Sequence, residues 1–82
     1  MINVQYFGRI RQLTGKQGDE IKAGKVSEVI RQIEKLYGRN IAKEAEKCFV
    51  MVNGRNAALI KGFRTQLKSG DLVQILPPTG GG

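Results

Sequence analysis

The sequence predicts a small α+β domain whose segments run strand, strand, helix, strand, strand. The first observation is that apolar and polar residues alternate over residues 2–7, which is typical of a half-buried strand. The second is that apolar residues recur every three or four positions between residues 29 and 37, which is typical of an amphipathic helix. The third is a pair of later apolar stretches, "CFVMV" and "LVQIL", beside turn residues. A chain of 82 residues has room for one domain with one core.

The first two strands are expected to pair as a hairpin. Alternate residues from Ile2 to Tyr6 share one face of the first strand, while Phe7 is an apolar residue on the otherwise polar opposite face. The loop that follows is rich in glycine and is expected to hold one short helical turn at residues 9–13. A second strand at residues 20–23 would then pair with the first.

One main helix is expected in the middle of the chain. Ser27 can act as its N-cap by accepting a hydrogen bond from a free backbone N–H group. Gly38 suits the left-handed turn that would end it. The apolar residues on one side of this helix are Val29, Ile30, Ile33, Leu36 and Tyr37. For residues 39–47 the sequence leaves both a ragged helical turn and a loop open.

The second half of the chain is expected to return to strands. The dipeptide Asn-Gly at residues 53–54 favours a tight turn, because both residues tolerate positive φ. A short strand is expected at residues 57–60. The last strand is expected at residues 72–76, with Val73 and Ile75 facing inward.

The side chains of the domain lack the usual catalytic combinations. The chain has no histidine, and its single cysteine, Cys48, is expected to be a small core residue. The common zinc ligand sets and the Ser/His or Cys/His nucleophile pairs are therefore excluded, and we expect no bound metal or cofactor. Asp19 and Glu20 are adjacent, so in an extended segment they would point to opposite faces. Any chemistry is expected outside the folded domain.

The charge balance is strongly basic, with 14 Lys and Arg residues against 7 Asp and Glu residues. The cations are spread along the chain without a dense run, so a solvated surface is the favoured interpretation and nucleic acid is not an expected partner. Arg31, Lys35 and Arg39 recur at four-residue spacing, where like charges destabilise a helix by roughly 0.2–0.5 kcal/mol per pair. An acidic partner would relieve this repulsion.

The hydropathy pattern predicts a cytoplasmic protein without a membrane segment. No stretch approaches the roughly 20 apolar residues that a membrane-spanning helix needs. The sequence begins directly with the alternating strand pattern, without the charged and then apolar regions of a secretory signal.

The last six residues, "PPTGGG", combine two prolines with three glycines, and no charged side chain follows Asp71. Residues 1–76 are therefore expected to form the domain and residues 77–82 a flexible tail. Pro77 and Pro78 favour an extended conformation. Glycine lacks a side chain, so the terminal residues could thread a narrow channel and leave the terminal carbonyl open to attack. Six extended residues reach roughly 20 Å, enough to enter a buried site of a partner.

The sequence resembles the MoaD/ThiS family of ubiquitin-like sulfur carriers, most closely its molybdopterin synthase small-subunit branch. The matching stretches are "YFGRIRQLTG", "VNGR" and "LKSGDLVQILPPTGGG", and the last is the most specific. The stretch between "VNGR" and "SGD" has the length common in archaeal members, while the basic charge departs from the often acidic family members.

This resemblance implies a β-grasp fold, a mixed sheet of four to five strands packed on one main helix. It also implies a carrier rather than an enzyme, with two partners: an E1-like adenylating enzyme that uses ATP, and the large subunit of molybdopterin synthase. Gly82 would carry the adenylate and then the thiocarboxylate, and Gly80 and Gly81 would belong to the inserted tail.

A docking patch for a partner is expected on the outer face of the sheet. Asn3, Gln5 and Gln74 mark this face as solvent-accessible, yet apolar residues share it. The residues expected to bind a partner are Phe7, Met51, Leu76, Pro77 and Pro78. The alternatives are a ubiquitin-like modifier joined to lysines, a thiamine-type or tRNA-type sulfur carrier, and a basic β-grasp binding module for which the tail would be dispensable.

Overall fold

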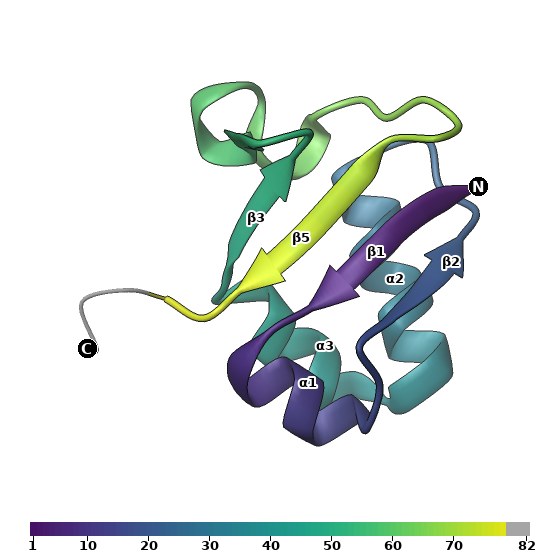
Figure 1. Cartoon of the computed structure of the whole chain (residues 1–82), viewed down its shortest axis with the longest axis vertical. Helices are drawn as coiled ribbons and strands as arrows, with labels where there is room; N and C mark the ends of the chain where they lie inside the picture. Colours follow the sequence, from purple (N-terminus) through teal and green to yellow (C-terminus); the bar gives the residue numbers. More distant parts are fainter. Residues whose placement is uncertain (79–82) are drawn as a thin grey trace.

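Figure 1 shows the computed structural model of the chain, in which helices lie on one side of a five-stranded mixed sheet. The structure describes residues 1–78. The elements along the chain are β1 (Ile2–Tyr6), α1 (Gly8–Thr14), β2 (Gly18–Ile21), α2 (Val26–Tyr37), α3 (Arg39–Glu46), β3 (Phe49–Val52), β4 (Arg55–Asn56), the short 3-10 helices η1 (Ala57–Leu59) and η2 (Gly62–Arg64), and β5 (Leu72–Leu76). This arrangement is the expected β-grasp fold.

The last strand, β5, occupies the centre of the sheet. The strand order is β2-β1-β5-β3-β4, and β5 pairs in parallel with β1 and antiparallel with β3. Val73 and Ile75 are fully buried, as the alternation of β5 predicts. The segment that follows β5 therefore leaves from the middle of the sheet, at the end where α1 begins (Figure 1).

The core lies between the inner face of the sheet and the helices. Most of its members come from β1, β3 and β5 on one side and from the apolar stripe of α2 on the other, and Ile10 of α1 joins them. The largest of its fully buried side chains are Tyr6, Ile2, Ile10, Ile33, Ile75, Val4, Val26, Val29 and Val73. Cys48 packs against this core while half-buried, and its thiol donates to the Glu44 carbonyl at 3.3 Å.

The start of α2 differs from the sequence prediction, which placed the N-cap at Ser27. The helix begins at Val26, and the capping residue, Lys25, makes no side-chain capping bond. The Val26 N–H donates to the Thr65 carbonyl at 3.0 Å, and the Gly24 N–H donates to Glu28 Oε1 at 2.7 Å. Pairing with a distant segment of chain fixes the helix start, and the hydroxyl of Ser27 is not used as a cap.

Three local predictions needed correction in length, position or type, and the segment that the sequence left open is a helix. The helical turn expected at residues 9–13 is a seven-residue helix, α1, and the open segment after Gly38 is a full helix, α3. The strand expected at residues 20–23 lies at Gly18–Ile21 and pairs with β1 as predicted. The prediction of a strand at residues 57–60 is wrong, because the 3-10 helix η1 occupies Ala57–Leu59.

The tight turn predicted at residues 53–54 is confirmed by the backbone, whereas Gly38 ends α2 with φ 100° and ψ 168°, outside the left-handed helical region that the sequence predicted. Asn53 and Gly54 adopt φ values of 51° and 85°, as a two-residue turn between β3 and β4 requires.

The repulsion expected among Arg31, Lys35 and Arg39 does not act within one helix. Arg39 begins α3, whereas Arg31 and Lys35 belong to α2. The Arg39 Nε atom lies 3.5 Å from Glu34 Oε2. Within residues 1–78, no helix has the length and apolar character needed to cross a membrane.

Candidate functional site

The segment that leaves β5 is held against the start of α1. Gly8 opens α1 with a φ of 60°, and a methyl group built on it would lie 3.0 Å from Pro77 Cγ. The absent side chain of Gly8 is therefore what allows the Pro77 ring to lie so close to the backbone. On the neighbouring strand, the Phe7 N–H donates to the Ile75 carbonyl at 3.1 Å. These contacts fix where the chain leaves the sheet.

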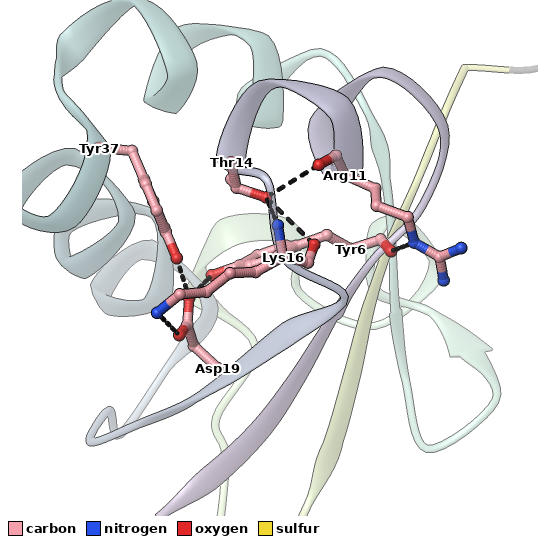
Figure 2. Close-up of polar contacts among 6 residues, drawn as sticks. All are labelled: Tyr6, Arg11, Thr14, Lys16, Asp19 and Tyr37. Carbon is pink, nitrogen blue, oxygen red and sulfur yellow. Dashed lines mark hydrogen bonds and ion pairs between the residues drawn. The ribbon is translucent and has the colours of Figure 1, made fainter.

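Phe7 lies between β1 and α1 and is held from both sides. The Arg11 guanidinium lies over the Phe7 ring, 5.3 Å from its centroid, within the range of a cation–π contact. Arg11 Nε also donates to the Tyr6 carbonyl at 3.1 Å (Figure 2). The half-buried Phe7 ring therefore keeps one orientation beside the end of β5.

The outer face of the sheet carries four large apolar side chains near this end of β5, which we call the outer patch: Phe7, Phe49, Met51 and Leu76. Phe49 is the register partner of Leu76, and Met51 is the register partner of Gln74. Residues paired across antiparallel strands point to the same face, so Phe49 and Leu76 extend the patch from β5 to β3. Phe49 is 38% exposed, and the other three members are half-buried.

The other end of this face is polar. Gln5 and Gln74 are register partners on β1 and β5, and Gln74 Nε2 donates to Gln5 Oε1 at 3.1 Å. Asn3 is exposed on the same strand. The outer face thus changes from polar to apolar toward the point where Pro77 leaves the sheet.

A polar cluster beneath the outer patch fixes Tyr6, the residue before Phe7. The hydroxyls of Tyr6 and Tyr37 both donate to Asp19 Oδ2, at 2.9 and 2.5 Å, and Lys16 Nζ lies 3.3 Å from Asp19 Oδ1 (Figure 2). The two rings meet edge to face, with centroids 6.2 Å apart. The cluster therefore joins β1, β2 and the end of α2.

The ionisation of this cluster follows from its burial and hydrogen bonds. Burial opposes the charge of Asp19, but hydrogen bonds from Tyr37, Tyr6 and Lys16 outweigh it and lower the pKa of the carboxyl. Burial, together with the Asp19 carboxylate, raises the pKa of Tyr37 to about 12 and also raises the pKa of Tyr6. Near neutral pH the two hydroxyls are therefore donors to an ionised carboxylate.

The structure brings together most of the residues that the sequence singled out. Met51 and Leu76 share the outer face, Phe7 lies at its edge, and Pro77 and Pro78 are exposed where the chain leaves β5. Gly80, Gly81 and Gly82 lie outside the described residues. Sequence reasoning missed Phe49 as a patch member, although its two-residue spacing from Met51 was a usable signal.

Comparison with known proteins agrees with this geometry. A candidate sulfur carrier protein of Archaeoglobus fulgidus is 34% identical over 76 residues, which cover 80% of this chain and 86% of that protein. Small archaeal modifier protein 3 of Haloferax volcanii is 30% identical over an alignment of 90 positions, gaps included, which covers 99% of this chain and 98% of the relative.

Among solved structures, molybdopterin converting factor subunit 1 of Pyrococcus furiosus superposes with a TM-score of 0.77 at 30% identity, covering 94% of this chain and 95% of that one. The Amycolatopsis orientalis BexX/CysO complex contains a chain with a TM-score of 0.83 at 28% identity, and both chains are covered completely. A Helicobacter pylori complex of molybdopterin-converting factor subunits 1 and 2 contains a chain with a TM-score of 0.69 at 27% identity, covering 99% of this chain and 97% of that one. Two of these three similar chains were therefore solved in complex with a second protein.

The fold and the central position of β5 define a β-grasp protein of the ubiquitin-like class. The sequence model of the ThiS family matches residues 4–82. The chain belongs to the ThiS family, and the match extends through the terminal glycines.

Proposed function

We propose that this protein is a sulfur carrier whose terminal glycine, Gly82, is activated and then bears sulfur as a thiocarboxylate. The observation that carries the proposal is the placement of β5. The central strand ends beside the partly exposed outer patch and leads into Pro77 and Pro78, in a chain whose family match reaches residue 82. Residues 1–76 would serve as the recognised body and residues 77–82 as the segment that enters a partner's site.

The proposed chemistry requires an activating partner, because the terminal carboxylate cannot accept sulfur until one of its oxygens becomes part of a leaving group. A terminal carboxylate is ionised at neutral pH, since its pKa is near 3.5, and is a poor electrophile. An E1-like enzyme would let a carboxylate oxygen attack the α-phosphorus of ATP, with pyrophosphate leaving. A hydrosulfide-equivalent donor would then attack the carbonyl carbon, forming the C–S bond and releasing AMP. ATP would be used by that enzyme and not held by the carrier.

The favoured pathway is the synthesis of molybdopterin. The support is the similarity to chains described as subunit 1 of molybdopterin converting factor, at 30% and 27% identity. In the second case that chain lies in a complex with subunit 2. By analogy, the large synthase subunit would accept the tail of this carrier in the cytoplasm and take up its sulfur, with the outer patch against its surface.

Protein modification is the second candidate function. It is favoured by one observation, the 30% identity to small archaeal modifier protein 3 over 99% of this chain. The same activated Gly82 carbonyl could react with a lysine amine, with AMP as the leaving group, and would form an isopeptide bond.

Mass spectrometry of the carrier isolated from its native host distinguishes these functions. A thiocarboxylate replaces one oxygen by sulfur, and a lysine conjugate attaches the whole chain to a second protein. We expect the thiocarboxylate, formed only when the activating enzyme is present. An unmodified terminus under every growth condition, and after incubation with that enzyme, ATP, a sulfide donor and a lysine-bearing acceptor protein, would refute both functions.

Replacing Pro77 by glycine is expected to slow activation by about two- to fivefold. The ring of Pro77 packs against Gly8, and loss of a proline's restriction of the chain corresponds to roughly 0.4–1 kcal/mol. Pro78→Gly is the matched control, because Pro78 is exposed and lies one residue beyond the Gly8 contact, and it should slow activation less. The measurement is kcat/KM for the cognate activating enzyme, with Tm recorded for both variants. Equal effects of the two variants would argue against a directing role for the Gly8 contact.

Replacing Phe7 by serine is expected to weaken binding to the large subunit about tenfold or more, as loss of an interface anchor does. The free energy of unfolding should fall by only about 1 kcal/mol, because the half-buried ring loses mainly its contact with Arg11. Leu36→Ser, on the exposed side of α2, is the control and should bind normally. The measurement is calorimetric titration, with chemical unfolding of each variant. A large loss of stability with normal binding would assign Phe7 to the core.

A further inference from the structure

The segment 57–64, which we call the arm, exposes large apolar side chains away from the outer patch. It comprises η1, η2 and the two residues between them, and it lies beside β3 as the green coils in Figure 1. Leu59 is 82% exposed, Phe63 is 46% exposed, and Ile60 is exposed between them. Neighbouring apolar residues exposed on one short segment are a feature of interaction sites.

Hydrogen bonds hold the arm in one conformation. Asn56 Oδ1 accepts from the Ala58 N–H at 2.9 Å. The buried hydroxyl of Thr65 accepts from the Lys61 N–H at 3.1 Å and donates to the Ala57 carbonyl at 3.4 Å. The backbone of the arm is therefore ordered by hydrogen bonds from its own flanking residues. Because its apolar side chains are already in place before a partner binds, the entropic cost of binding is lower.

A groove of about 200 Å³ lies beside the arm and would accept an apolar side chain. Phe63 and Ala58 line it from the arm, and Phe49 and Val50 line it from β3. Phe49 is also a member of the outer patch, so the groove is continuous with that surface. Glu46 is the one carboxylate among its lining residues.

Cations outnumber carboxylates along the part of the sequence that contains the arm, although Glu46 and Asp71 also lie close to it. Between residues 47 and 70 the sequence has no Asp or Glu but holds five cations: Lys47, Arg55, Lys61, Arg64 and Lys68. None of them takes part in the three ion pairs formed within residues 1–78. Their charges are therefore available to carboxylates of another molecule.

We propose that the arm and its groove bind an acidic segment of a partner protein that also carries leucine- or phenylalanine-like side chains. The cations around the arm would meet the carboxylates, while one apolar side chain would fill the groove against Phe63 and another would cover the exposed Leu59. A concave apolar groove favours a protein side chain over a membrane, which offers no such projection. The cations are too widely spaced along the chain, with only two exposed aromatic rings, Phe49 and Phe63, among them, for the stacking that single-stranded RNA requires.

The test is NMR titration of the full chain, labelled with ¹⁵N, against three defined probes. The first is a flexible peptide of glutamates interspersed with leucine and phenylalanine, paired with a counterpart in which every glutamate is glutamine. The second is vesicles of phosphatidylserine and phosphatidylcholine, and the third is oligouridylate. We expect saturable shifts at residues 57–64 and at Phe49 with the acidic peptide, weakening as salt is added.

Variants of the arm separate the charge and the apolar contributions. Lys61→Glu combined with Arg64→Glu should weaken peptide binding about tenfold, the scale expected for two exposed ion pairs. Leu59→Ser combined with Phe63→Ser should weaken it by a similar factor. The matched control is Lys35→Glu with Leu36→Ser, which changes an exposed cation and an exposed leucine on α2 and should leave binding unchanged.

Three outcomes would overturn the proposal: equal binding of the glutamine peptide, shifts centred on α2 or unaffected by the arm variants, and tighter binding of vesicles or oligouridylate than of the acidic peptide. None of these measurements involves ATP, sulfur or Gly82. A negative result in this titration would therefore not contradict the proposed carrier function. A negative result for the carrier function would likewise not contradict the proposed binding surface.

Discussion

Removing Gly81 and Gly82 is expected to abolish activation by the adenylating enzyme while leaving the fold intact. The last paired strand ends at Leu76, so the deletion removes no strand pairing and no core side chain found in residues 1–78. The new carboxylate would be set back by two residues, roughly 7 Å of extended chain, which is too far to reach the bound nucleotide. The measurement is ATP–pyrophosphate exchange with the cognate activating enzyme, together with the mass change when sulfur replaces oxygen.

Two further variants show whether position or composition of the terminus decides the result. One residue added after Gly82 should also abolish exchange, because it moves the carboxylate past the site and places a side chain in the channel. Thr79→Ser keeps the length and the terminal glycines, so it should exchange normally. Full exchange by the truncated chain would refute the carrier function and favour the interpretation as a binding module that does not need its tail.

The main strands and the main helix were predictable because each has a strong local pattern. Strand β1 alternates strictly from Ile2 to Tyr6, α2 has an apolar stripe that includes Val29 and Ile33, and the Asn-Gly dipeptide at residues 53–54 admits few structures other than a tight turn. In each case the local conformational preference agrees with the tertiary environment, so the structure of the segment can be predicted from a single sequence.

The elements that were missed or misplaced depend on contacts far apart in the sequence. The start of α2 is fixed by a bond from Val26 to Thr65, so the hydroxyl of Ser27 was a misleading signal. The segment 57–60 has strand-like composition, but the side chains of Asn56 and Thr65 hydrogen-bond its backbone and turn it into a 3-10 helix. Composition alone cannot report such partners.

The candidate site was predictable in its members and only partly in its geometry. The alternation of β5 placed Leu76 on the outer face, and that assignment agrees with the register of β3 and β5. The contact of Pro77 with Gly8 joins residues at opposite ends of the sequence and follows only from the parallel pairing of β1 with β5. The role of the outer patch in partner binding stays a prediction until variants such as Phe7→Ser are measured.

The polar cluster fixes Tyr6, the residue before Phe7, and its contribution to stability offers a second strong test. Replacing Asp19 by alanine is expected to lower the free energy of unfolding near neutral pH by about 2–4 kcal/mol. The variant loses hydrogen bonds from two tyrosine hydroxyls to a charged acceptor and leaves the hydroxyl of the fully buried Tyr6 without this partner. Chemical unfolding measures the change. Glu20→Ala, at the adjacent exposed carboxylate, is the control and should stay within about 0.5 kcal/mol of the parent.

The pH dependence of this difference tests whether the charge of Asp19 is the cause. The pKa of Asp19 is lowered in the folded state, so its stabilising contribution is present above the unfolded pKa and is lost as the pH falls through the folded pKa. The parent should therefore lose stability faster than the Asp19→Ala variant as the pH falls below about 4, and the two unfolding curves should converge. Asp19→Asn keeps an acceptor oxygen without the charge and should lie between them near neutral pH. A deficit of Asp19→Ala that is as large in acid as at neutral pH would mean that lost packing, and not the ionised carboxylate, accounts for the stability of this cluster.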